Sequence, residues 1–183
     1  MEMTLKDIWN ALTPEEKNDA CMSFWERKDP TSRQAQALVI QQLAPLYKFR
    51  PVYIERKTPA EKAKLLIGRM ERPVMQDVRD EVVQIFLLVR KGDIVRRFLD
   101  AQGIAHSNGL IDDNAPAPTE ASLRKGIAAI LADFPKRDAA LYLGFSVACK
   151  NNEFWVNIEP AVLAEIPDLL ETLRGAQPAD VAK

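Results

Sequence analysis

At residues 139–149 the chain reads AALYLGFSVAC, which is apolar at almost every position. A helix that is apolar on all sides must be enclosed by other parts of the protein, because it has no polar face to turn toward water. Residues 74–91 form a second region of this kind, where an apolar stripe at helical spacing runs from Val74 to Val89. We therefore predict two buried helices, over residues 74–91 and 137–149, at the centre of a helical fold.

Helix start signals recur along the chain. The segments Thr13-Pro14-Glu15-Glu16 and Thr58-Pro59-Ala60-Glu61 share the pattern Thr-Pro-x-Glu. In such a capping box the threonine oxygen accepts a hydrogen bond from the amide three residues on, and the glutamate accepts one from the threonine amide. Proline is tolerated between them because the first helical amide has no partner in the helix. Asp29 and Thr119 are placed to cap two further helices.

The length and composition fit one globular domain. The chain has 183 residues, of which 47% are hydrophobic and 28% are charged. We predict an all-α fold, a compact multi-helix bundle in a single domain over residues 1–175, followed by a flexible tail at 176–183. A cation closes a helical segment before a polar turn at Lys28, Lys91 and Lys150. This pattern leaves open a duplicated helical hairpin, although many unrelated helices end in the same way.

Three segments do not have a helical pattern. Residues 51–55 and 154–158 are rich in β-type side chains, and we expect each to be an extended connector or an isolated strand. Residues 103–118 contain many turn formers and are predicted to be one long irregular loop. A loop of that length in a compact chain is usually functional or mobile.

Basic residues are concentrated in the middle of the chain. Residues 48–97 contain thirteen basic and seven acidic residues, whereas the segments on both sides are net acidic. A charge asymmetry of this kind is typical either of a surface for an acidic partner or of a domain whose own parts attract one another. Our leading hypothesis is a non-enzymatic binding or scaffold protein that contacts an acidic protein surface. The residues expected to make that contact are Arg50, Arg56, Lys57, Arg96 and Arg97.

A second hypothesis places a pocket at the 103–118 loop and makes the chain a small-molecule-binding protein or an enzyme. His106 is the only histidine, and Asp112 lies in the same loop. A histidine can act as a general base when a carboxylate orients it. The residues after Asp112 do not form a calcium loop, because Ala117 and Leu123 stand where glycine and a bidentate carboxylate are needed.

Other signs of catalysis are missing from the sequence. One histidine and two distant cysteines do not make a zinc site, and the scattered glycines form no phosphate-binding loop. We therefore expect no metal and no cofactor, and the sequence leans away from an enzyme.

A third hypothesis is a nucleic-acid-binding regulator. Residues 47–57 interleave Tyr47, Phe49 and Tyr53 with cations, and the next predicted helix adds more cations, including Arg69. Aromatic rings can stack on bases while cations neutralise phosphates. The alternative is that the rings pack beneath the connector while the cations face water. The overall pI of about 5.9 argues against a dedicated nucleic-acid binder.

The sequence also favours a cytoplasmic protein. Cys21 and Cys149 lie in apolar helical stretches, and we expect two buried thiols in a reducing compartment rather than a disulfide. The N-terminus is polar and acidic, unlike a signal peptide. The apolar run at residues 85–89 is too short to span a bilayer, so we expect no membrane segment.

Overall fold

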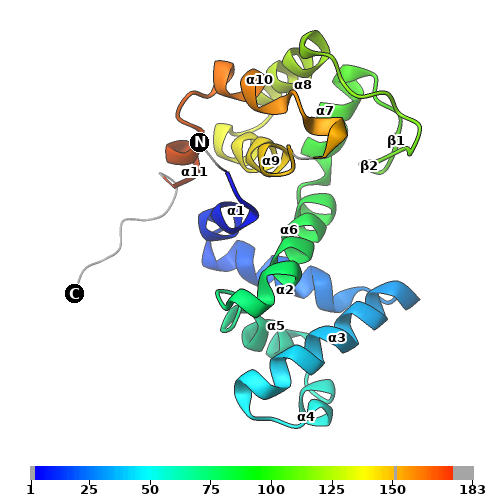
Figure 1. Cartoon of the computed structure of the whole chain (residues 1–183), viewed down its shortest axis with the longest axis vertical. Helices are drawn as coiled ribbons and strands as arrows, with labels where there is room; N and C mark the ends of the chain where they lie inside the picture. The colour runs from blue at the N-terminus through cyan, green and yellow to red at the C-terminus, as the bar shows by residue number, and fades with distance from the viewer. Residues whose placement is uncertain (1–2, 151, 175–183) are drawn as a thin grey trace, which may run out of the picture. The chain divides into compact units, whose positions relative to one another are not determined.

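The computed structural model describes residues 3–150 and 152–174 (Figure 1), and this part of the chain is mainly helical with almost no strand. The prediction of an all-α fold is confirmed. The chain divides into two compact units. We call Leu12–Arg90 the middle unit, and Met1–Ala11 together with Lys91–Lys183 the terminal unit. The single domain and the duplicated hairpin stay predictions, and the tail at 176–183 lies outside the described residues.

The middle unit is built from five α-helices and one 3-10 turn. They are α2 (Pro14–Glu26), α3 (Pro30–Tyr47), α4 (Pro51–Glu55), α5 (Pro59–Ile67), η1 (Pro73–Met75) and α6 (Gln76–Arg90). Helix α2 packs against both α5 and α6. Both predicted capping boxes are present, at Thr13 with Glu16 and at Thr58 with Glu61. They set the starts of α2 and α5.

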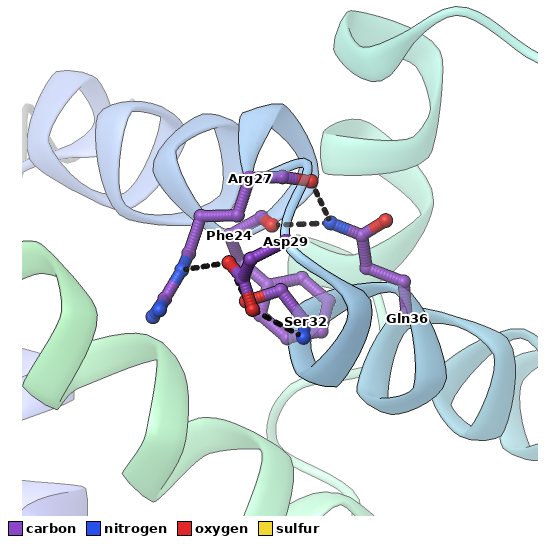
Figure 2. Close-up of polar contacts among 5 residues, drawn as sticks. All are labelled: Phe24, Arg27, Asp29, Ser32 and Gln36. Carbon is purple, nitrogen blue, oxygen red and sulfur yellow. Dashed lines mark hydrogen bonds and ion pairs between the residues drawn. The ribbon is translucent and has the colours of Figure 1, made fainter.

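The corner between α2 and α3 is fixed by side-chain caps (Figure 2). Asp29 accepts hydrogen bonds from the Ser32 amide at 2.9 Å and from the Ser32 hydroxyl at 2.7 Å. These bonds lower the pKa of the Asp29 carboxyl, the one from the side chain most strongly. Gln36 Nε2 donates to the carbonyl oxygens of Phe24 and Arg27, at 2.8 and 3.0 Å. The end of one helix and the start of the next are therefore capped together, because each leaves backbone groups without helical partners.

The predicted buried helix at 74–91 is realised in part. Val82, Val83 and Phe86 of α6 are almost fully buried. Val74 and Val89, the two ends of the predicted stripe, are 56% and 57% exposed. The expectation of a helix enclosed along its whole length is therefore wrong at both ends, where more than half of each side chain is open to solvent.

The terminal unit surrounds the other predicted buried helix. Its elements are α1 (Leu5–Ala11), α7 (Gly92–Gln102), β1 (His106–Ser107), β2 (Leu110–Ile111), α8 (Glu120–Asp133), α9 (Lys136–Ala148), η2 (Glu153–Trp155), α10 (Ile158–Glu165) and α11 (Leu169–Arg174). Helix α9 contacts α1, α7, α8, α10 and α11, so the prediction of an enclosed helix here is confirmed (Figure 1). Gly144 allows α1 to approach, because a Cβ at this position would lie 2.8 Å from Ile8 Cδ1.

Both segments expected to be extended are helical instead. Residues 51–55 form α4, and residues 154–158 continue from η2 into the first residue of α10. The sequence prediction relied on β-type side chains. No partner strand lies beside either segment, and a helix satisfies backbone groups locally. Pro51 also occupies the first position of its helix, where its fixed φ angle favours helical geometry.

The predicted irregular loop at 103–118 contains a small hairpin. Strands β1 and β2 pair antiparallel around Asn108 and Gly109, whose φ angles are 52° and 88°. Two consecutive residues with positive φ are typical of a tight two-residue hairpin turn, and Asn-Gly is its preferred sequence. The segment is therefore more ordered than the expected loop.

Cys21 and Cys149 are not joined in a disulfide bond. Cys21 is buried, and burial raises the pKa of its thiol, whereas Cys149 is only half-buried. The expectation of two buried thiols is therefore correct for the first cysteine only. Within residues 3–150 and 152–174, none of the helices has the length and apolar character needed to cross a membrane.

Candidate binding surface

The middle unit exposes apolar side chains at α4 and the turn before it. Phe49, Val52 and Tyr53 are 38%, 45% and 52% exposed, although they lie within five positions of one another. Single exposed apolar residues are common, but a cluster of them often marks a contact surface. Together with Tyr47 and the surrounding cations, we call this the aromatic–basic surface. Its cations are Lys48, Arg50, Arg56, Lys57 and Arg69.

The end of α3 turns the chain so that these side chains meet. The Phe49 amide donates to the Ala44 carbonyl at 2.9 Å, and the Lys48 amide donates to the Pro45 carbonyl at 3.2 Å. This is the Schellman pattern of a helix C-terminus. It requires a left-handed residue, and Lys48 has a φ angle of 56°. Glycine is usual at such a position, so the chain holds a lysine in a strained conformation at the entrance to the surface.

The three aromatic rings form a continuous row. The rings of Tyr47 and Phe49 are stacked, with centroids 5.7 Å apart and planes 15° from parallel. The rings of Phe49 and Tyr53 meet edge to face at 4.8 Å. Both arrangements are favourable for aromatic pairs. Each ring of the row is therefore in contact with a neighbouring ring.

Cations cover the two ends of this row. The Arg69 guanidinium lies 4.3 Å from the centre of the Tyr47 ring, and Lys57 Nζ lies 4.5 Å from the centre of the Tyr53 ring. Lys57 also lies 3.5 Å from the carboxylate of Glu61. Hydrogen bonds from the Thr58 amide and hydroxyl, helped by Lys57, lower the pKa of Glu61.

Tyr47 ties the end of α3 to α5. Its hydroxyl donates to the Leu65 carbonyl at 2.7 Å. That carbonyl lies in the last turn of α5, where backbone oxygens lack helical partners. Gly68 makes room for the contact, because a Cβ at this position would lie only 2.7 Å from the Tyr47 hydroxyl oxygen. The end of α3 and the end of α5 are thus joined by this contact.

Three of the five predicted contact residues belong to this surface. Arg50 and Arg56 flank α4, are exposed, and have no ion-pair partner within the described residues. Lys57 is half-buried and paired as described above. Residues 48–72 contain eight basic and only three acidic residues, so most of the local positive charge is not neutralised within the segment.

Arg96 and Arg97 belong to the terminal unit instead. Arg96 forms an ion pair with Asp93, and Arg97 Nε lies 2.6 Å from Asp133 Oδ2. Each arginine therefore has a carboxylate partner within its own unit. The aromatic–basic surface is formed without them.

The alternative loop site has a different geometry from the one expected. His106 Nδ1 accepts a hydrogen bond from the Gly109 amide at 3.1 Å, and Nε2 lies 3.0 Å from Asp100 Oδ1. Because Nδ1 is an acceptor, the proton of the neutral ring is on Nε2 and is donated to Asp100. Both ring nitrogens are occupied, so the histidine ties the hairpin to the end of α7.

Asp112 does not contact the histidine. Its backbone amide donates to the Ala105 carbonyl at 3.1 Å, and its side chain is exposed without a hydrogen bond to the described residues. The carboxylate that meets His106 is that of Asp100, which sequence reasoning did not single out. Within residues 3–150 and 152–174, no group of three or more histidine, cysteine or acidic side chains is placed to hold a metal ion.

Comparison with models of protein families, with curated protein sequences and with solved structures gives no match to the chain.

Proposed function

We propose that the middle unit is a non-enzymatic protein-binding module that contacts an acidic protein segment through the aromatic–basic surface. One observation carries this proposal. Exposed Phe49, Val52 and Tyr53 lie in the same short segment as Arg50 and Arg56, two exposed cations without an ion-pair partner among the described residues. Aromatic residues and arginine are the residue types enriched where binding energy is concentrated in protein interfaces.

The two kinds of side chain would contribute differently. Burying the apolar side chains against a partner removes them from water and supplies affinity. Unpaired exposed cations attract a partner of opposite charge and increase the rate of encounter more than the affinity. An acidic segment that also carries an aromatic or aliphatic side chain would satisfy both requirements.

The arrangement of the rings favours protein over nucleic acid. A base stacks on the open face of an aromatic ring. In this row Tyr47 and Phe49 stack on each other, Tyr53 meets Phe49, and both tyrosines are covered by a cation. Less of each face is therefore left for bases, whereas the exposed edges and aliphatic atoms remain suitable for apolar protein side chains.

The proposal is tested by selecting binders from random peptides displayed on phage, with the full-length chain as bait. We expect the enriched peptides to combine Asp or Glu with Phe, Leu or Trp. Binding should be lost in the double variant Arg50→Glu/Arg56→Glu. The matched control is Arg33→Glu, an exposed arginine on α3 with no ion-pair partner among the described residues. This charge reversal should leave binding unchanged.

Two results would overturn the proposal. The first is enrichment of basic or uncharged peptides, or no enrichment. The second is equal binding by the double variant and the control. A thymine oligonucleotide that binds more tightly than every selected peptide, and weakens steeply with salt, would favour the nucleic-acid hypothesis instead.

A further inference from the structure

Arg69 differs from the other cations of the aromatic–basic surface. The central carbon of its guanidinium, Cζ, lies over the Tyr47 ring, 4.3 Å from the ring centre. Its Nε is buried and has no hydrogen-bond partner. The guanidinium makes one long contact, from Nη1 to the Gly68 carbonyl at 3.4 Å, and has no carboxylate partner within the described residues.

The position of this guanidinium is fixed by its surroundings. The backbone amide of Arg69 donates to the Leu66 carbonyl at 3.1 Å, which anchors the residue at the end of α5. The ring beneath it is held by the bond from the Tyr47 hydroxyl to Leu65. An arginine held on a rigid ring loses little conformational freedom when it binds, so its donors are pre-organised.

Unpaired donors in such a position are suited to a carboxylate. A guanidinium is planar and can donate two parallel hydrogen bonds to one carboxylate, which a lysine ammonium does not do. The buried Nε is closed to a partner, whereas Nη2 is accessible and has no hydrogen-bond partner within the described residues, so Nη1 and Nη2 form the edge that a carboxylate can approach. Arg50 and Arg56 are exposed, and no aromatic ring of the described residues holds either guanidinium in place.

We propose, on the basis of the proposed function, that Arg69 is the residue that recognises a specific carboxylate of the partner. The ligand is the side chain of an Asp or Glu that neighbours an apolar residue in the bound segment. The carboxylate pairs with the guanidinium while the apolar neighbour packs on Phe49, which stacks on the same tyrosine ring. Arg50 and Arg56 attract the segment without selecting a position in it.

The test uses two labelled peptides and the full-length chain. The acidic peptide is acetyl-EEFLDEELFDEE-amide, and its neutral twin is acetyl-QQFLNQQLFNQQ-amide. Fluorescence anisotropy measures the affinity of each for the wild type, for Arg69→Lys and for the matched control Arg33→Lys, at an exposed arginine of α3 outside the aromatic–basic surface. Both substitutions keep the charge, and only the first removes a guanidinium that lies over a tyrosine ring.

We expect the wild type to prefer the acidic peptide. Arg69→Lys should lower the affinity for the acidic peptide by about 10-fold or more, because charge-assisted hydrogen bonds are lost. The same substitution should change the affinity for the neutral twin by less than about 2-fold, because a peptide without carboxylates cannot accept the two parallel hydrogen bonds of the guanidinium. Arg33→Lys should retain the full preference of the wild type.

The outcomes separate the two proposals. If the wild type binds both peptides equally, or neither, the acidic-partner function itself is refuted. If the wild type prefers the acidic peptide and Arg69→Lys keeps that preference, only the role of Arg69 is refuted. A second measurement needs no variant. The Nε–H signal of Arg69 in the nitrogen-15 spectrum of the wild type should shift on addition of the acidic peptide but not of its twin, and an unmoved signal would also refute the role.

Discussion

Replacing Gly68 by alanine should have opposite effects depending on the residue at position 47. A Cβ at Gly68 would lie 2.7 Å from the Tyr47 hydroxyl oxygen, closer than unbonded atoms of this kind approach. The hydroxyl must then move away from the Leu65 carbonyl, to which it donates at 2.7 Å. Tyr47→Phe removes the oxygen atom that causes the clash and the hydrogen bond together.

The magnitudes follow from the contacts. Gly68 has a φ angle of −63°, which alanine adopts readily, so the substitution by itself should stabilise by about 0.4–1 kcal/mol. In the wild type, loss of the hydrogen bond costs about 1 kcal/mol. Displacement of the ring from Arg69 costs about 0.5–1 kcal/mol more. We therefore expect Gly68→Ala to destabilise the wild type by about 1 kcal/mol and to stabilise the Tyr47→Phe variant by about 0.5 kcal/mol.

Urea denaturation of the four proteins in this double-mutant cycle measures the effect. The midpoints give the changes in the free energy of unfolding, provided that the slopes stay the same. The predicted coupling energy is about 1–2 kcal/mol, within the range for residues in contact. If Gly68→Ala shifts the midpoint equally in both backgrounds, the hydroxyl does not occupy the place described here, and the anchoring of Arg69 through Tyr47 is refuted.

Three further predictions concern the caps. Lys48→Gly should raise the free energy of unfolding by about 0.5–1 kcal/mol, because glycine adopts the left-handed conformation of this position without strain. Gly103→Ala should lower the free energy of unfolding by about 1 kcal/mol, because alanine is strained at a φ angle of 70°. Urea midpoints that move in the same direction in the two variants would contradict these two predictions. Gln36→Leu should lower the free energy of unfolding by about 1–2 kcal/mol, since two carbonyls at the end of α2 lose their donor. An unchanged urea midpoint would rule out the cap. The pKa of Glu61 is lowered in the folded state, so its stabilising effect is present near neutral pH and is lost as the pH falls through that pKa. Acid titrations followed by circular dichroism should show a shallower loss of stability in Glu61→Gln, and parallel curves would contradict the Thr58 contact.

Helix starts were predictable because their signals are local. Each capping side chain accepts a hydrogen bond from the amide three residues on, so both partners can be identified from their spacing in the sequence. This holds for Thr13, Asp29, Thr58 and Thr119. The hairpin also has a local signal, the Asn-Gly pair at its turn, which sequence reasoning left inside a loop.

The remaining features depend on contacts between distant segments. Val89 fits the apolar stripe of its helix but is exposed, because a stripe does not indicate how much of it another helix will cover. The contact of Arg69 with Tyr47 joins the ends of two helices, and no spacing rule relates residues placed in this way. The sequence predicted a basic, aromatic region, whereas only the structure identifies which arginine lies on a ring.

The most direct test of the central claim maps the binding surface on the wild-type chain. Amide signals should be followed by nuclear magnetic resonance while the acidic peptide acetyl-EEFLDEELFDEE-amide is added. The account predicts that the largest shifts fall at residues 47–57 and at Arg69. Shifts centred on the hairpin around His106, or spread evenly over the chain, would contradict it.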